Sequence, residues 1–413
     1  MNLVIKLITF ILLGIPQAIF NPFFWFVLVI VYIQYKRAAD FEEKMFGFVT
    51  TNPIKRVSSS LLYGIFGGFL GSVIVVALGV SIAGSGLSYV WPLALLLMLI
   101  SPHLMCFSYA GGIISVISLL FGVPKVDVAG LMALVGVLHA VESLLIYLSG
   151  HLNASPVFIK DEKRGIIGGY LMQSFWPVPF ILLTIATGIP SGVDSVNMPD
   201  WWPIIRPPFV DLENALYLML PVVAALGYGD FALTRLPGKK GRESAFNLLI
   251  FSTLLILISV LASRINFFKY IAALFAPVGH EYLINIGKAK EKKGDPLFTV
   301  PPFGMRILYV LENSPAEKMG LKPGDIILSI NNKAVNSIED LKEIKALAPA
   351  YIWMEYLNTK NEVKYSEMSF YPYGFESLGV VLIPRGEEVP AISLEESGLI
   401  KKIKNLFSKK PSS

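Results

Sequence analysis

Long apolar runs constrain this chain more than any other feature of its sequence. Hydrophobic residues make up 54% of the 413 residues and charged residues only 16%, which is too apolar for a single water-soluble globule. Runs of about 20 apolar residues match the roughly 30 Å hydrocarbon core of a bilayer. Six clear runs occur, at Leu61–Ala83, Val128–Ser149, Ile166–Ile189, Leu212–Leu233, Ser244–Ala262 and Ile265–Ile286. The sequence therefore predicts an α-helical polytopic membrane bundle over residues 1–287, with about eight to ten crossings.

Two further apolar runs are interrupted by residues that break helices. Leu3–Ile33 contains Pro16 and the pair Asn21-Pro22, and Tyr89–Gly122 contains Ser101-Pro102-His103. Each run is long for one crossing and short for two. A broken helix, a tight hairpin or a re-entrant pair fits either run, provided that protein or water satisfies the freed backbone groups.

Basic residues gather in three loops between the apolar runs. They are Lys36, Arg37, Lys44, Lys55 and Arg56, then Lys160, Lys163 and Arg164, then Arg235, Lys239, Lys240 and Arg242. Residues 190–211 instead hold one basic residue, three aspartates and the aromatic pair Trp201-Trp202. The positive-inside rule predicts that the basic loops and the chain after residue 287 are cytoplasmic. Anionic lipid and membrane topology account for these charges, so no nucleic-acid partner is expected.

Residues 306–332 change character, because strand and turn signals replace the apolar runs. Arg306–Leu311 reads as a strand, and Ser314 with Pro315 can begin a short helix that ends at Gly320. A turn at residues 322–325 then returns the chain as the strand Ile326–Ile330. A second helix is predicted at Ser337–Leu347, followed by strands at Tyr351–Tyr356, Val363–Phe370 and Ser377–Ile383.

This pattern closely resembles the bacterial PDZ domain, a small, mostly β peptide-binding module of the α+β class. The domain is expected over residues 303–385, after a charged linker at 288–302 and before a basic amphipathic tail at 386–413. Leu399, Ile403, Leu406 and Phe407 share one face of a predicted tail helix that can touch lipid or a partner, and a frayed end fits equally.

PDZ domains bind an extended peptide at a sheet edge, with backbone N–H groups around its terminal carboxylate. Two loops are candidates for this nest, meaning the group of backbone N–H groups that binds the carboxylate. They are Pro302–Met305 and Glu376–Gly379. The first is preferred because it leads directly into the strand at Arg306. The candidate peptide-binding residues are Phe303, Gly304, Met305, Arg306, Ile307, Leu378 and Gly379. Loss of peptide binding, with Gly379 forming only a bulge, remains the alternative.

Enzymatic chemistry finds little support in the sequence. A membrane zinc protease needs His-Glu-x-x-His, and His280-Glu281 lacks the second histidine. His139 and Glu142 form another intramembrane pair, so the two pairs are weak candidates for a metal site across the bundle. Hydrogen bonding inside the bundle explains them more simply. The single Cys106 excludes a disulfide framework, and no cofactor is expected.

Several phrases in the membrane part point to a family. They are Asn21-Pro22-Phe23-Phe24-Trp25, Leu138-His139-Ala140-Val141-Glu142, Ser155-Pro156-Val157-Phe158, Gly168–Pro179 and Gly279-His280-Glu281. Together with the PDZ-like module, they make the chain resemble the MinJ-type cell-division topological determinants of Gram-positive bacteria. The resemblance implies a non-enzymatic scaffold in the cell membrane, enriched at the septum and poles. It implies MinD-like and DivIVA-like partners, beside peptide C-termini and membrane lipids. A PDZ-containing intramembrane protease or protease regulator is the alternative.

Overall fold

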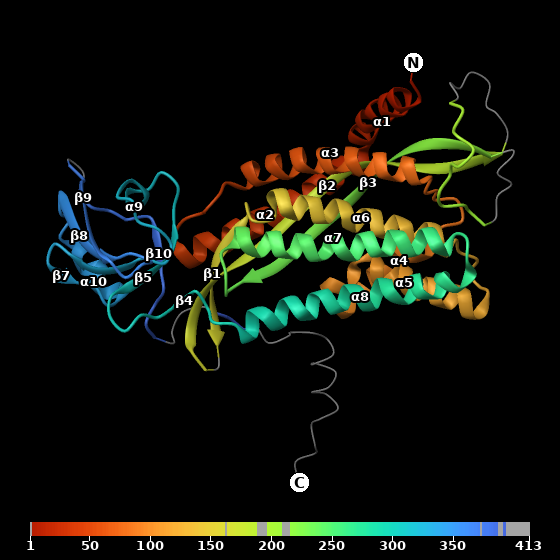
Figure 1. Ribbon diagram of the computed structural model, residues 1–413. Coiled ribbons are helices and arrows are strands. Elements are labelled where there is room, and N and C mark those ends of the chain that lie inside the picture. Colours follow the sequence, from red (N-terminus) through yellow and green to blue (C-terminus); the bar gives the residue numbers. More distant parts are fainter. Residues whose placement is uncertain are drawn as a thin grey trace, which may run out of the picture.

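The computed structural model describes residues 2–161, 163–187, 196–208, 215–371, 374–386 and 391–393. They form an elongated molecule, in which a long bundle of helices and strands carries a smaller β-rich domain at one end (Figure 1). The helical membrane part followed by a PDZ-like domain is therefore confirmed as the fold class.

The helices of the bundle follow the apolar runs in most places. They are α1 (Leu3–Phe20), α2 (Pro22–Phe46), α3 (Pro53–Leu78), α4 (Leu87–Ile100), the 3-10 helix η1 (Pro102–Met105), α5 (Phe107–Phe121), α6 (Val128–Ser149), α7 (Pro237–Ala262) and α8 (Asn266–Lys293). By length and composition, four of these described helices can cross a membrane, namely α1, α3, α6 and α7. The total number of crossings stays a prediction.

The interrupted run at Leu3–Ile33 is a broken helix. The side chain of Asn21 accepts a hydrogen bond from the Phe23 N–H at 2.9 Å, and Pro22 occupies the first turn of α2. An asparagine cap followed by proline begins a helix and cannot continue the preceding one. This local chemistry separates α1 from α2.

The interrupted run at Tyr89–Gly122 is a pair of short helices joined by η1. Helix α4 has 14 residues and α5 has 15, so each spans only about 21–23 Å at 1.5 Å per residue. The pair enters and leaves the bundle at the same end, where the Asp127 N–H donates to the Gly84 carbonyl at 2.7 Å. The tip of this hairpin, residues 101–106, is therefore directed into the bundle.

Two runs expected as membrane helices are strands instead. Ile166–Ile189 lies mostly in β2 (Gly165–Thr187), and Leu212–Leu233 mostly in β3 (Ala215–Ala232). The strands pair antiparallel from Tyr170↔Ala232 to Thr187↔Ala215, so each satisfies the backbone of the other. An apolar run does not by itself distinguish a buried strand from a buried helix, whereas Pro177 and Pro179 weaken the helical alternative.

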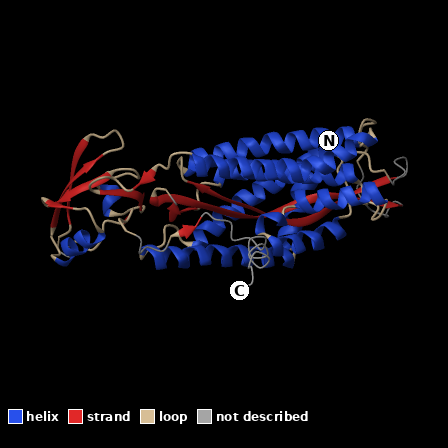
Figure 2. Ribbon diagram, turned by 90° about the horizontal axis from the view of Figure 1, so that it is seen from below, coloured by secondary structure: helices blue, strands red, loops and turns tan. Residues whose placement is uncertain are grey.

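Helices cover this long hairpin, as the strands running between them show (Figure 2). Helix α3 approaches β2 closely at two glycines. A Cβ atom on Gly64 would lie 2.3 Å from the Pro177 carbonyl oxygen, and one on Gly68 would lie 1.9 Å from that of Pro179. The absence of both side chains allows the helix backbone to pack directly on the strand.

Three shorter strands complete the hairpin sheet near the β-rich domain. Strand β1 (Ala154–Asp161) pairs antiparallel with β2, while β4 (Phe298–Thr299) pairs with β2 and β11 (Ile392–Ser393) pairs with β1. The region expected as a linker is thus structured: residues 288–293 continue α8, and β4 joins the bundle sheet. The tail helix expected after Leu394 lies outside the described residues.

The PDZ-like domain has the elements that its sequence predicts. They are β5 (Met305–Val310), α9 (Pro315–Lys318), β6 (Ile326–Ile330), α10 (Ile338–Ala346), β8 (Tyr351–Leu357), β9 (Val363–Ser369) and β10 (Val380–Leu382). The two-residue strand β7 (Lys333–Ala334) was not predicted. The sheet order is β10-β5-β6-β8-β9, with β7 paired to β6. The strand expected at Ser377–Ile383 is shorter, because residues 377–379 form a loop before β10.

Candidate functional site

Local capping chemistry begins both helices of the PDZ-like domain. The Ser314 hydroxyl accepts the Glu317 N–H at 3.3 Å, with Pro315 following it. Ser337 caps α10, where the Asp340 carboxylate in turn accepts the Ser337 N–H at 2.9 Å. These caps are readable in the sequence, and they place α9 and α10 on the apolar core of the domain.

Strand β10 forms one end of the described sheet. It pairs on one side with β5, through Val380↔Val310 and Leu382↔Ile307, and within the described residues no strand pairs with its other side. Leu378 and Leu382 belong to the same apolar cluster as Ile344 of α10. An unpaired strand edge beside an apolar cluster suits the addition of an extended peptide.

The loop before β10 presents backbone N–H groups. Gly379 has a φ of +71°, and its N–H donates to the Ser377 hydroxyl at 3.1 Å. Among the described residues, the N–H groups of Ser377 and Leu378 have no acceptor. The loop is also anchored, since the Leu378 carbonyl accepts the Ala316 N–H at 3.0 Å and the Gly379 carbonyl accepts that of Leu311 at 2.8 Å. Free N–H groups on an anchored turn can bind a carboxylate.

In the other candidate loop, Pro302–Met305, both backbone groups of Gly304 are engaged. The Gly304 N–H donates to the Asn336 side chain at 2.9 Å, and the Gly304 carbonyl accepts from the Arg385 guanidinium at 3.0 Å. The same guanidinium also bonds to the carbonyls of Pro301 and Pro302. Because these groups are already paired, this loop offers little for a peptide carboxylate.

The seven candidate peptide-binding residues do not form one site. Leu378 and Gly379 lie beside the end of β5, whereas Phe303 and Gly304 precede its start. Strand β5 has six residues, or about 20 Å at 3.3 Å per residue. Met305 and Ile307 are fully buried in the core, Arg306 is half-buried with its side chain on the Thr299 carbonyl, and Phe303 is exposed.

The PDZ-like domain sits on the bundle through a shared apolar cluster. Leu308 of β5 and Ile383, just after β10, pack with Tyr170 of β2 and Phe298 of β4. The Tyr170 hydroxyl also donates to the Leu308 carbonyl. Gly168 makes room for this seat, because a Cβ atom there would lie 3.0 Å from Leu308 and 3.3 Å from Ile383. The two parts thus share one core at their junction.

A buried ion pair braces the bundle beside that junction. Arg56 at the start of α3 donates to Glu42 near the end of α2 at 2.7 Å, and both side chains are almost completely buried. The Thr50 N–H donates to the same carboxylate at 2.8 Å, and the Ser155 hydroxyl donates to it from β1. Burial, with the Glu312 and Glu42 carboxylates nearby, raises the pKa of the neighbouring Tyr309 phenol to about 12.

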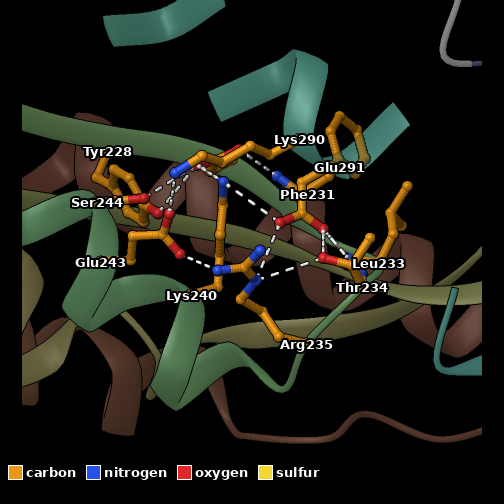
Figure 3. Close-up of polar contacts among 11 residues, drawn as sticks. Tyr228, Phe231, Leu233, Thr234, Arg235, Lys240, Glu243, Ser244, Lys290 and Glu291 are labelled. Carbon is orange, nitrogen blue, oxygen red and sulfur yellow. Dashed lines mark hydrogen bonds and ion pairs between the residues drawn. The ribbon is translucent and has the colours of Figure 1, made fainter. Parts of the chain in front are cut away.

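A second polar cluster fixes the end of α8, from which the chain enters the PDZ-like domain (Figure 3). Buried Glu291 accepts the N–H groups of Leu233 and Thr234, each at 2.8 Å. Lys240 of α7 lies 3.0 Å from Asp230 and 3.6 Å from Glu291. These bonds join α7, α8 and the end of β3, so the position at which α8 ends is determined by all three.

The three basic loops lie at the same end of the bundle as the PDZ-like domain (Figure 1). Lys55 pairs with Glu312 of this domain at 3.5 Å, and Arg164 pairs with Asp295 before it at 2.8 Å. Trp202 lies at the other end, where its indole N–H donates to the Val76 carbonyl near the end of α3 at 2.9 Å. Which end faces the cytoplasm stays a prediction.

The intramembrane histidines come together, but the expected His/Glu pairs do not form one site. The rings of His139 and His280 are 5.1 Å apart. Glu281 accepts a hydrogen bond from Tyr109 at 2.6 Å, and Glu142 is not part of the group formed by the two histidines. Cys106, which sequence reasoning set aside, joins the histidines instead. The one sequence signal for this role was that the cysteine lies next to the break between two apolar stretches.

Comparisons with known proteins agree with this architecture. Residues 306–349 match the family model of the PDZ domain. Over 394 residues the chain is 23% identical to the cell division topological determinant MinJ of Bacillus subtilis (strain 168). This alignment covers 90% of this chain and 95% of that protein. Over 86 residues it is 28% identical to the probable cell division topological determinant MinJ of Lacticaseibacillus paracasei, which covers 21% of this chain and 23% of that protein.

The MinJ-type resemblance is confirmed. It extends from the PDZ domain into the membrane part, because the Bacillus alignment covers nine-tenths of the chain. The chain therefore combines a PDZ domain, apolar helices able to cross a membrane, and likeness to a cell-division protein.

Proposed function

We propose that this chain is a membrane-anchored PDZ adaptor for division-site placement, which recruits cytoplasmic Min-type regulators to the poles and septum. Its likeness to a protein named a cell division topological determinant supports the biological context. The observation that carries the adaptor role is the unpaired outer side of β10 beside the Glu376–Gly379 loop. An extended peptide can add to that edge while its carboxylate meets the free N–H groups.

In this proposal the PDZ domain and the three basic loops face the cytoplasm. Their location at one end of the bundle supports this orientation, because basic loops are retained on the inner side. Anchoring confines the domain to the membrane surface and raises the effective concentration of weakly held partners. The apolar seat around Leu308 and Tyr170 would hold the domain at a constant height above the lipid.

The role is non-catalytic in this proposal, with MinD-like and DivIVA-like proteins as partners. Partner recognition is assigned to the Glu376–Gly379 loop rather than to Pro302–Met305. The paired backbone groups of Gly304 support this choice over the preference drawn from the sequence.

Crosslinked capture of the full-length protein from its native cells, with identification by mass spectrometry, tests the proposal. Ser377→Asp keeps an acceptor for the Gly379 N–H and adds a negative charge where a carboxylate would bind. Recovery of the partner held by the PDZ domain should fall roughly tenfold, which corresponds to about 1.4 kcal/mol of like-charge repulsion. Ser369→Asp, on the exposed face of β9, is the matched control and should leave recovery unchanged.

The outcomes separate the parts of the proposal. Equal recovery with Ser377→Asp and Ser369→Asp would exclude the Glu376–Gly379 loop as the binding site. Capture of cleaved membrane proteins in place of division proteins would contradict the adaptor role and favour the alternative of a PDZ-containing membrane protease.

A further inference from the structure

Three side chains with metal-binding atoms converge inside the bundle. Cys106 caps α5 at the tip of the short hairpin, while His139 and His280 lie near the middle of α6 and α8. The Cys106 sulfur is 3.1 Å from His139 Nε2 and 3.9 Å from His280 Nε2. The three ligand atoms all lie within 4.8 Å of one another.

These separations suit a single tetrahedral ion. With Zn–S near 2.3 Å and Zn–N near 2.0 Å, a tetrahedral angle places sulfur and nitrogen ligands about 3.5 Å apart. The two observed sulfur–nitrogen distances lie on either side of this value. Both sulfur–nitrogen pairs therefore lie within about half an ångström of the separation that a shared ion requires.

Both imidazoles are held in the tautomer that a metal requires. His139 Nδ1 lies 2.7 Å from the Val135 carbonyl oxygen, an acceptor, so Nδ1 carries the proton and Nε2 keeps its lone pair. Tyr109 donates its hydroxyl proton to Glu281 at 2.6 Å. The Tyr109 oxygen, 3.3 Å from His280 Nδ1, is then an acceptor, so His280 likewise presents an unprotonated Nε2.

Such outer hydrogen bonds are typical of metal-binding histidines, because they orient the ring and increase its basicity. The His280–Tyr109–Glu281 chain matches this pattern, with a tyrosine between the ring and the carboxylate. On another side the Phe251 ring lies edge-on to His139, 5.5 Å away, and 5.9 Å from His280. The ligands thus lie between an apolar wall and an ordered polar chain.

A thiol–imidazole hydrogen bond alone leaves this convergence only partly explained. A neutral thiol has one proton, whereas two Nε2 atoms face the sulfur. The Ser108 hydroxyl, 3.3 Å from His139 Nε2, can supply the second donor when no ion is bound. A cation satisfies the thiolate and both nitrogens at once, and the mixed sulfur and imidazole set favours zinc among common biological divalent ions.

We propose that Cys106, His139 and His280 bind one Zn²⁺ ion inside the membrane part, with a water molecule in the fourth position. The ion joins the tip of the α4–α5 hairpin to α6 and α8. This site is separate from the PDZ domain, so its failure would leave the proposed adaptor role untouched.

Metal content of the full-length chain tests the site directly. The protein is purified in mild detergent without a polyhistidine tag, loaded with Zn²⁺, freed of excess metal and analysed by mass spectrometry for zinc. One zinc ion per chain is expected, and Cys106→Ser, His139→Asn and His280→Asn should each lose it. His151→Asn, at an exposed histidine outside the cluster, is the matched control and should retain full zinc content.

Two further measurements address variants that fail to fold. Tyr109→Phe removes only the outer hydrogen bonds and should weaken zinc binding by roughly 10–100-fold while the chain stays folded. In the unmodified chain, zinc should protect Cys106, the single cysteine, from alkylation, and a chelator should remove that protection. Unmodified protein that retains no zinc after loading, or alkylation that zinc does not slow, would overturn the proposal.

Discussion

Replacing Glu42 by glutamine should destabilise the junction between α2 and α3 more than any surface change nearby. The carboxylate is fully buried and accepts hydrogen bonds from Arg56, from the N–H and hydroxyl of Thr50, and from Ser155. Glutamine keeps the size and one acceptor oxygen but leaves the Arg56 guanidinium buried without a counter-charge. Breaking a buried pair in this way costs about 3–5 kcal/mol.

Trypsin cleavage under native conditions measures this loss, because Lys44 and Lys55 flank the loop that Glu42 holds. When opening is fast relative to cleavage, the rate follows the population of the open form. A loss of about 3 kcal/mol should therefore raise the rate roughly 100-fold, since 1.4 kcal/mol corresponds to a factor of ten. Glu43→Gln removes the same charge from the exposed neighbouring residue and should change the rate little.

A double variant separates the lost pair from the lost charge. Glu42→Gln with Arg56→Gln removes both charges and should cost less than the sum of the two single changes, because neither partner is left charged alone. Equal cleavage rates for Glu42→Gln and Glu43→Gln would refute the reasoning, since a buried, paired carboxylate cannot be as dispensable as an exposed one.

Three further changes test other parts of the structure. Gly168→Val should loosen the seat of the PDZ domain by about 1–3 kcal/mol through its contacts with Leu308 and Ile383, seen as faster proteolysis before β5, whereas Gly229→Val, with open space around it, should not. Gly304→Val should lower the unfolding midpoint, because Gly304 has a φ of +75° and a Cβ atom there would lie 2.6 Å from the Ile327 carbonyl; an unchanged midpoint would count against this conformation. Hydrogen bonds from the Asn336 N–H and from Ser337 hold the pKa of Asp340 below its usual range, so its stabilising effect is present at neutral pH and lost as the pH falls through that lowered value. Asp340→Asn should thus be less stable than the unmodified chain by about 0.5–1 kcal/mol at pH 7, and a stability difference that does not shrink as the pH is lowered would contradict the assignment.

Much of the PDZ domain was predictable because its signals are local. Ser314 and Ser337 cap their helices by accepting the N–H of the residue three positions later. Gly320, two residues after α9, has a φ of +81°, a left-handed conformation that ends this helical segment. The strand at Ile326–Ile330 has the predicted bounds. Such features depend on neighbouring residues in the chain, so the sequence contains nearly all the information that determines them.

The candidate sites were less predictable because they depend on distant residues. Gly304 suits a carboxylate nest by sequence, but Asn336 and Arg385 already occupy its backbone groups. Cys106, His139 and His280 come from three separate helices, and no spacing in the chain relates them. The location of the PDZ domain on the hairpin likewise depends on Gly168 and Tyr170, far from it in sequence.

The sequence alone determined that residues 1–287 are mostly apolar enough for a membrane, and that a PDZ domain follows them. Only the tertiary structure decided that β2 and β3 are strands. An apolar segment must be kept from water, but its backbone can form its hydrogen bonds either within a helix or with a neighbouring strand. That choice depended on two strands pairing with each other and on the glycines of α3 packing against carbonyls of β2. The composition of a segment therefore shows that the segment is buried. The strand or helix with which it pairs depends on the whole fold.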